Sequence, residues 1–299
     1  MKRVLVTGGS GFIGQHALPY LVEKGYEVHC VTSGAPRKES AVQWHRADLF
    51  SESECREIFR SVKPSHLLHF AWYTEPGKYW TSEKNLEWVR ASLDILKNFK
   101  ASGGTRATFA GTCAEYDRNF GFCSEGITPC VPDTLYGTCK NSLRQMASSY
   151  SELNHVSFSW GRIFFLYGPG EHPSRLVSSV IRSLLRNEEA KCTHGDQIRD
   201  FLHAEDVASA FAALLDCNVE GPVNIASGEP VSLKTVINGI GVKIGNPARI
   251  SFGAIPVPAN DPPVILADTR RLNKEVGWKQ KYSLDAGLDD VIEWWKHHL

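Results

Sequence analysis

The chain has 299 residues, of which 42% are hydrophobic and 22% are charged, a composition typical of a globular protein with a sizeable core. Lys+Arg and Asp+Glu both number 33, so the charge balance gives no indication of a nucleic-acid partner or a membrane surface. No apolar run is long enough to span a bilayer and no secretion signal opens the sequence, so we expect a cytoplasmic protein.

The cysteines and histidines give no sign of a metal site. The 8 cysteines form no CxxC pair, and the 11 histidines are scattered. Without a secretion signal we expect reduced thiols in place of disulfides. A metal site would need clustered ligands, so we predict none.

The chain opens with an apolar run, a glycine-rich turn and an apolar-periodic segment, which predict a strand at 4–6 and a helix at 12–22. Gly8, Gly11 and Gly14 would allow a tight turn, close approach of a pyrophosphate, and packing of the helix on the strand. The helix N-terminus, with Phe12 and Ile13, would bind the phosphates through its N–H groups and dipole. This stretch predicts a dinucleotide site.

The second expected strand, 26–31, ends where such folds choose between NAD and NADP. An acidic residue there binds the ribose 2′-hydroxyl, whereas a basic one accommodates a 2′-phosphate. Here Thr32 and Ser33 are followed by Arg37 and Lys38, and no carboxylate appears before Glu39. The two cations could be a solvated loop, but the missing acid favours NADP(H), with NAD still possible.

Two further strands, 44–48 and 66–71, place more residues at the same edge of the sheet. Asp48, followed by Leu49, could accept a hydrogen bond from the adenine amino group or cap the helix expected at 52–62. Phe70 and Ala71 follow the fourth strand at the edge that faces a cofactor, while His69 is expected to be structural. The loop after Trp72 is rich in aromatic residues and is expected to cover a ligand or a partner chain.

A helix at 83–100 and a strand at 107–110 lead to Thr112 and Cys113, and a further helix runs from Tyr136 to about residue 153. Tyr136 and Lys140 lie four apart, so they share one face of that helix. A phenol has a pKa of about 10 and exchanges protons poorly at neutral pH. A nearby ammonium would lower that pKa and make Tyr136 a usable general acid or base. Thr112 could donate a further hydrogen bond to the same substrate oxygen.

These motifs together resemble the extended short-chain dehydrogenase/reductases, the nucleotide-sugar epimerase, dehydratase and reductase group. The residues that carry the resemblance span nearly the whole chain: 7–14, Asp48-Leu49, 69–71, Asn85, Thr112, Tyr136-Gly137-x-x-Lys140, Arg162, 167–170 and Arg199-Asp200-Phe201-x-His203. The resemblance implies a catalytic triad of Tyr136, Lys140 and Thr112, with Lys140 also binding the nicotinamide ribose. It implies an α/β fold, a Rossmann-type doubly wound parallel sheet with a smaller mixed α/β substrate-binding domain.

The turn after Thr112 discriminates between members of this group. Dehydratases of the group carry an acid one or two residues after the Thr, where this chain has Cys113 and Ala114, and Glu115 falls one place late. Fucose-synthase-like members look to a cysteine two places after the Ser/Thr, and Cys113 is one place early. Three hypotheses remain: a reductase of a nucleotide-linked 4-keto-6-deoxysugar, a C4 epimerase with tightly held NAD, and a non-enzymatic dinucleotide sensor. The acid-free end of the second strand favours the reductase over the epimerase, and the intact triad argues against the sensor.

The second half of the chain is expected to hold the nucleotide sugar. Arg162 lies inside a strand expected at 157–165, and Phe165 replaces an Asn that often contacts the sugar phosphate in relatives. Arg199 lies in a segment matching the one that clamps the diphosphate, although an Arg199–Asp200 surface pair is the alternative. The expected substrate contacts are Trp72, Thr112, Cys113, Arg162, Arg175 and Arg199.

The domain boundaries follow from this organisation. We expect a cofactor domain at 1–166, to which the chain returns around 196–218 and 255–270. The substrate domain would comprise 167–195, 219–254 and 271–299, with helices at 268–276 and 284–297. The resemblance also implies a homodimer paired through the helices at 83–100 and 137–153.

Overall fold

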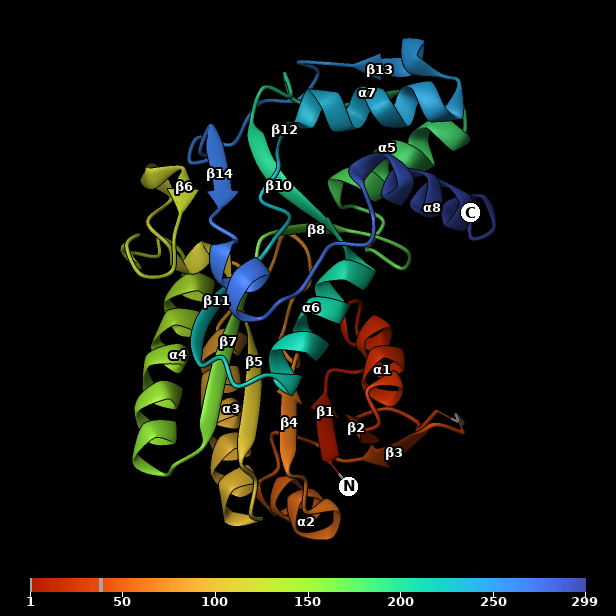
Figure 1. Cartoon of the computed structure of the whole chain (residues 1–299). Coiled ribbons are helices and arrows are strands. Elements are labelled where there is room, and N and C mark those ends of the chain that lie inside the picture. The colour runs from red at the N-terminus through yellow and green to blue at the C-terminus, as the bar shows by residue number, and fades with distance from the viewer. Residues whose placement is uncertain (1, 38–39) are drawn as a thin grey trace.

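A computed structural model describes residues 2–37 and 40–299. A seven-stranded parallel sheet forms its centre, in the order β11-β7-β5-β4-β1-β2-β3 (Figure 1). The apolar runs of the sequence become these strands because both faces of a parallel sheet are covered. The strands are β1 Arg3–Thr7, β2 Glu27–Thr32, β3 Val42–Arg46, β4 His66–His69, β5 Arg106–Thr112, β7 Ser157–Ile163 and β11 Gly221–Ile225.

Helices cover both faces of this sheet. One face carries α1 Gly14–Glu23 and α6 Ala204–Asp216, and the other carries α2 Glu52–Val62, α3 Lys84–Ala101 and α4 Leu135–Leu153 (Figure 1). The strand order reverses between β1 and β4, and in such sheets ligands bind beyond the carboxyl ends of the strands at that point. The expected doubly wound α/β fold is confirmed.

A smaller mixed unit lies beyond the carboxyl ends of these strands, at the top of Figure 1. Its five-stranded sheet has the order β12-β10-β14-β6, with β8 paired to β10. Three helices pack around its own core. The elements are β6 Phe122–Cys123, β8 Phe165–Tyr167, α5 Leu176–Leu185, β10 Ile198–His203, β12 Pro230–Ser232, α7 Leu233–Ile244, β14 Val264–Ala267 and α8 Leu284–Lys296, with a separate ribbon of β9 Ala190–Lys191 and β13 Ile250–Ser251 and short turns of helix at Cys113–Glu115, Arg118–Phe120 and Pro247–Arg249.

The chain crosses between the two sheets at other points than the sequence suggested. The strand expected at 157–165 is interrupted at Phe164, where the chain leaves the main sheet and β8 begins. Strand β11 belongs to the main sheet, although 219–254 was assigned to the substrate domain. Strands β10 and β14 belong to the second sheet, although 196–218 and 255–270 were expected to rejoin the cofactor domain.

One expected helix is wrong. At 268–276 the structure has only a short π-helical turn, Arg271–Glu275. The Asp268 carboxylate accepts hydrogen bonds from the backbone and side chain of Arg270, and within the turn only Leu272 is buried. A segment with one buried apolar residue has no continuous stripe with which to pack a longer helix.

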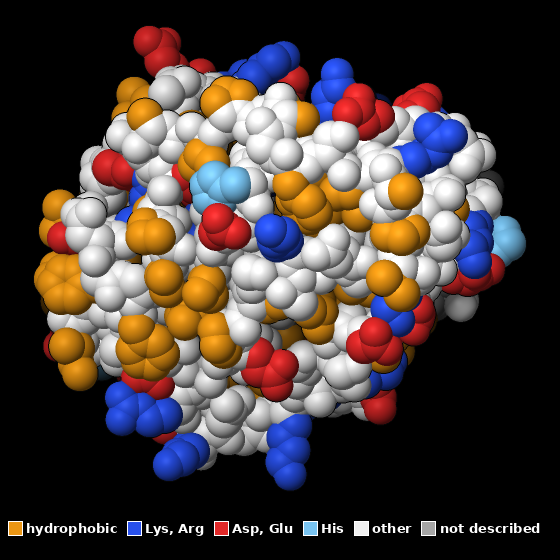
Figure 2. Space-filling model, turned by 90° about the horizontal axis from the view of Figure 1, so that it is seen from above, with side chains coloured by type: hydrophobic (Ala, Val, Ile, Leu, Met, Phe, Trp, Pro, Cys, Tyr) orange, Lys and Arg blue, Asp and Glu red, His pale blue; other side chains and the backbone are white. Residues whose placement is uncertain are grey.

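Charged side chains of both signs are interspersed over the face formed by the smaller unit (Figure 2). Hydrophobic side chains gather toward its left edge, on the side where β6 lies in Figure 1. The large exposed hydrophobic residues near β6 are Phe120, Phe122, Ile127 and Val131. Within the part of the chain that the structure describes, no helix combines the length and the apolar character needed to cross a bilayer.

Candidate active site

The glycine-rich turn brings the start of α1 against the end of β4. Gly8 has a φ of +73°, and a Cβ at this position would lie 2.6 Å from the backbone nitrogen of Ala71. The Gly11 amide donates to the Gly8 carbonyl (3.0 Å), and a Cβ on Gly14 would overlap that same oxygen. Helix α1 begins at Gly14 with no side-chain cap and no acidic residue in its first turn. An uncapped, acid-free helix N-terminus beside a turn without side chains fits the phosphates of a dinucleotide.

A cavity of about 510 Å³ opens beside this turn. It brings together Gly8, Thr32, Ser33, Asp48, Leu49 and Ala71, which the sequence assigned to the cofactor, with Ser10, Val31, Arg46, Ala47, Phe50, Glu54 and Trp88. Ser51 caps α2 by accepting from the Glu54 amide, so the capping alternative for Asp48 is wrong. The Asp48 carboxylate instead accepts from the Phe50 amide (2.9 Å) at the cavity wall.

Two cations lie near the end of β2. Arg37 lies over the Trp44 ring, 5.3 Å from its centre, and its Nη2 reaches the carbonyl of Ser10 at 3.4 Å. Arg46, which the sequence reasoning missed, is the register partner of Thr32 and lines the cavity. Its position as the last residue of a parallel strand beside β2 was the signal that could have found it. Lys38 and Glu39 lie outside the described residues.

The catalytic residues expected from the sequence meet where β5 ends and α4 begins. Thr134 caps α4, so Tyr136 and Lys140 lie in its first two turns. Tyr136 is only 8% exposed. Burial raises the pKa of its phenol, and a hydrogen bond with Thr112 opposes that rise. Lys140 donates to the carbonyl of Ala110 (2.9 Å), and its Nζ lies 3.7 Å from the centre of the Trp72 ring.

Burial, and not the charge of Lys140, has the largest effect on the Tyr136 pKa in this structure. We expected an ammonium to bring the phenol pKa down toward neutrality, but burial dominates and keeps that pKa above its ordinary value. Burial also lowers the pKa of Lys140, to about 7. The phenol therefore stays protonated at neutral pH.

The aromatic loop covers Tyr136. The ring of Tyr79 lies 4.9 Å from that of Tyr136, Trp80 lies at 5.7 Å and Trp72 at 6.5 Å. Asn85 ties this loop together by donating to the carbonyl of Tyr79 (2.7 Å) and accepting from the Trp72 indole (2.8 Å). Arg175, at the start of α5 in the smaller unit, lies over the Tyr79 ring. Both units thus contribute to the roof of the site.

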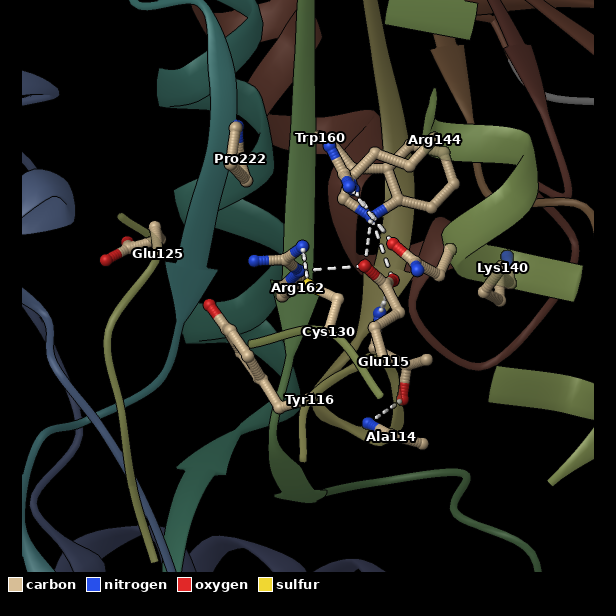
Figure 3. A network of polar contacts seen from close by, with 12 residues as sticks. Ala114, Glu115, Tyr116, Glu125, Cys130, Lys140, Arg144, Trp160, Arg162 and Pro222 are labelled. Atoms are coloured by element: carbon tan, nitrogen blue, oxygen red, sulfur yellow. Dashed lines mark hydrogen bonds and ion pairs between the residues drawn. The ribbon is translucent and has the colours of Figure 1, made fainter. Parts of the chain in front are cut away.

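Arg162 does not face the site, which corrects its assignment as a substrate contact. Its side chain is 1% exposed and its Nε donates to Glu115 (2.7 Å), which is itself fully buried (Figure 3). The Trp160 indole donates to the same carboxylate at 2.8 Å. Because the guanidinium points into the protein between β7 and the turn after β5, it has no surface left for a ligand. His69 is likewise internal, between Thr7 (2.6 Å) and Ser92 (2.9 Å).

The other residues assigned to the substrate lie in the smaller unit or beside it. Arg199 is buried and pairs with Asp261 (2.5 Å), so the Arg199–Asp200 surface pair is wrong. Asp261 lines a second cavity of about 1120 Å³ between 117–122, 131–133 and the proline-rich connector 259–264.

Burial raises the pKa of the Cys113 thiol to about 12. Phe70 packs edge-on against Phe211 of α6 at 4.9 Å.

Residues 2–37 and 40–299 contain no disulfide and no cluster of metal ligands. None of the eight cysteines is joined to another by a disulfide. No group of three His, Cys, Asp or Glu side chains in these ranges is arranged to hold a metal ion.

The parallel strand order and the glycine turn are those of a dinucleotide-binding α/β protein. The model of the NAD dependent epimerase/dehydratase family matches residues 4–226, and the chain belongs to this family.

Relatives in this family are nucleotide-sugar enzymes. The chain is 26% identical to CDP-abequose synthase of Salmonella typhimurium, over 97% of each protein. It is 25% identical to UDP-glucose 4-epimerase of Halalkalibacterium halodurans (99% of this chain, 96% of the relative) and 24% identical to dTDP-6-deoxy-L-talose 4-dehydrogenase of Aggregatibacter actinomycetemcomitans (78% and 87%). Among solved structures, MoeE5 in complex with UDP-glucose and NAD is 27% identical, with a TM-score of 0.85 over 99% of both chains.

Proposed function

We propose that the protein reduces the 4-keto group of a nucleotide-linked 4-keto-6-deoxysugar, with Tyr136 as the general acid. The observation that carries this proposal is the environment of Tyr136: burial raises its pKa, so the phenol carries the proton that a reduction must deliver. The relative named as a 4-dehydrogenase of a deoxysugar supports chemistry at the same position.

In this mechanism the bound nicotinamide supplies the hydride, and the residues of the chain handle the proton and the geometry. Tyr136 donates its proton to the ketone oxygen as negative charge develops there. Thr112, whose hydroxyl bonds to Tyr136 in the free protein, turns its single proton to that oxygen when the substrate is bound. Lys140 holds the nicotinamide ribose and stabilises the phenolate that remains. Trp72, Tyr79 and Trp80 exclude water above the reacting carbon.

We propose NADP(H) as the preferred cofactor. Arg37 and Arg46 lie near the end of β2, and the described residues 33–37 that follow this strand include no carboxylate. The Glu54 carboxylate, which also lines the cavity, accepts from the Asp48 amide (2.9 Å) and so is engaged with the backbone.

The proposed substrate contacts are Trp72, Cys113, Arg175 and Arg199. Arg199 would donate hydrogen bonds both to Asp261 and to a phosphate oxygen of the substrate. A guanidinium can serve both because its fork offers five donors.

A C4 epimerase is the second candidate. It is favoured by the relative named UDP-glucose 4-epimerase and by MoeE5, whose complex holds NAD and UDP-glucose. An epimerase needs Tyr136 both to take and to return a proton, and it consumes no reduced cofactor overall.

One experiment separates these functions. The purified protein is given NADPH and a panel of nucleotide 4-keto-6-deoxysugars, and the loss of nicotinamide absorbance is followed, with Tyr136→Phe as the matched control. Turnover that the Tyr136→Phe variant lacks supports the reductase. Tight NAD with sugar isomerisation but no net NADPH consumption overturns it in favour of the epimerase. Cofactor binding without turnover of any sugar would indicate a sensor.

We also propose a homodimer formed through α3 and α4, which lie side by side. Leu86 on α3 is 57% exposed and Met146 on α4 is 42% exposed, as expected of apolar residues at an interface. Light scattering on the wild type and on Leu86→Glu tests this, since the substitution should yield monomers.

A further inference from the structure

Glu115 has no place in the proposed proton transfer, yet its contacts lie directly behind the catalytic residues. Its side chain is fully buried and one oxygen accepts from the Thr112 amide (2.8 Å). The same carboxylate accepts from the indole of Trp160 (2.8 Å) and from Nε of Arg162 (2.7 Å). Figure 3 shows the side chains of Trp160 and Arg162, both from β7, converging on this carboxylate. The short helical turn after β5, capped by Thr112, directs Glu115 inward.

Two buried cations feel the charge of this one carboxylate, and Arg162 is the one that contacts it. Lys140 is 4% exposed and its ammonium contacts neutral groups, the Ala110 carbonyl and the faces of Trp72 and Trp160. Arg162 is 1% exposed, and its Nη1 has no partner within the described ranges. A buried ion is costly unless an opposite charge lies close to it. Burial lowers the pKa of Lys140, and Glu115 opposes that shift.

We propose that Glu115 is a positioning residue of the active site: its carboxylate fixes the backbone of Thr112 and is the counter-charge that keeps Lys140 an ammonium. The inference rests on the proposed function for the roles of Thr112 and Lys140, but it does not depend on which sugar is the substrate. Arg162 is part of the same network, because it holds the Glu115 carboxylate in place and adds one positive charge beside it.

The charge balance has to include every titratable group that faces Glu115 or Lys140. Tyr116 and His69 carry no charge at neutral pH, because burial raises the pKa of the Tyr116 phenol and lowers that of His69 to about 3. They therefore add little to the net charge around Glu115 and Lys140. The groups are His69 of β4, Tyr136 of α4, Arg162 of β7, Cys113 and Tyr116 beside Glu115, and Cys130, whose Sγ lies 3.0 Å from Arg162 Nη2.

The test measures the Lys140 pKa directly, without substrate or cofactor. The protein is labelled with 13C at the lysine ε-carbon, the Lys140 signal is assigned by its loss in Lys140→Met, and its shift is followed against pH. Glu115→Gln keeps the shape but removes the charge, so the Lys140 pKa should fall by about one unit. Arg162→Met removes a cation and should move that pKa in the opposite direction.

Two further variants keep the result decisive if the single variants fold poorly. Glu115→Gln/Arg162→Met removes one charge of each sign, so the Lys140 pKa should return toward that of the wild type. Arg106→Met removes another buried arginine, at the far end of β5, and should lower the melting temperature without moving the titration. Glu115→Gln and the double variant could lower stability as Arg106→Met does. If they do so while the Lys140 pKa is the same in every variant, the proposal is overturned. A failed sugar panel would refute the proposed function but leave this titration interpretable.

Discussion

The rings of Tyr79 and Tyr136 pack edge to face, with the centroids 4.9 Å apart and the planes at 85°. Tyr79 also shares a hydrogen bond with Arg175, which lies at the start of α5 in the smaller unit. The Tyr136 phenol, on helix α4 beside the main sheet, is therefore linked through one side chain to the unit proposed to hold the nucleotide sugar. Edge-to-face pairs of this kind fix the relative orientation of two rings.

Tyr79→Phe tests this link. The substitution keeps the ring packed on Tyr136 but removes the hydroxyl that Arg175 contacts. Arg175 is then no longer held in place by Tyr79 to contact the substrate. A hydrogen bond to a charged group contributes about 1.5–3 kcal/mol, so we expect KM for the nucleotide sugar to rise at least about 10-fold. Cofactor affinity should not change. Steady-state kinetics with Tyr73→Phe, whose hydroxyl bonds to exposed Glu75 in the same loop, is the matched control. Equal kinetics for both variants would show that the link has no functional role.

Lys140→Met should abolish activity and stabilise the fold. Burial lowers the Lys140 pKa from 10.5 to about 7, so between these values the unfolded chain binds more protons and stability rises with pH. The cost of the buried ammonium is therefore fully present below pH 7 and is relieved toward pH 10.5. Because Glu115 keeps Arg162 as its partner, replacing the depressed-pKa ammonium with an apolar side chain of similar length should stabilise the fold by roughly 1–4 kcal/mol at pH 6.

The measurement is urea unfolding at pH 6 and pH 10, where the gain from Lys140→Met should be large at the lower pH and small at the higher one. Lys97→Met, on the exposed side of α3, controls for the loss of a lysine as such. If Lys140→Met is no more stable than the wild type at pH 6, the ammonium is not destabilising there.

Gly8→Ala separates two reasons for a glycine at the phosphate turn. Gly8 and Gly25 both have positive φ (+73° and +77°), but a Cβ on Gly25 meets nothing within 4 Å, whereas one on Gly8 meets the backbone of Ala71. Gly25→Ala should therefore cost about 1 kcal/mol through its backbone conformation alone and leave cofactor binding intact. Gly8→Ala should cost more and abolish NADPH binding in a fluorescence titration. Retained binding in Gly8→Ala would mean that the turn can shift to accept a side chain.

The sequence predicted the main sheet and the proximity of Tyr136 to Thr112 because those features follow local rules. The glycine turn and the four-residue spacing of Tyr136 and Lys140 need no knowledge of distant contacts. The direction of Arg162 could not be predicted, since only the pairing of β5 with β7 brings it to Glu115. The short strands of the second sheet escaped for the same reason: β6 and β14 are two and four residues long and are defined by their neighbours.

Arg46 tests how the chain selects its cofactor. It lines the cavity beside Thr32 and Ser33, so a 2′-phosphate bound there would gain a charge-assisted contact that a 2′-hydroxyl would not. Arg46→Ala should therefore weaken NADPH binding about 10-fold and leave NADH binding unchanged, and adding Arg37→Ala should weaken NADPH further. Calorimetric titration of both cofactors measures this, with Arg56→Ala as a control, since Arg56 pairs with Glu52 on the surface of α2. Equal losses for NADPH and NADH would show that Arg46 supports the adenosine cavity as a whole, and tighter binding of NADH than NADPH by the wild type would overturn the proposed preference.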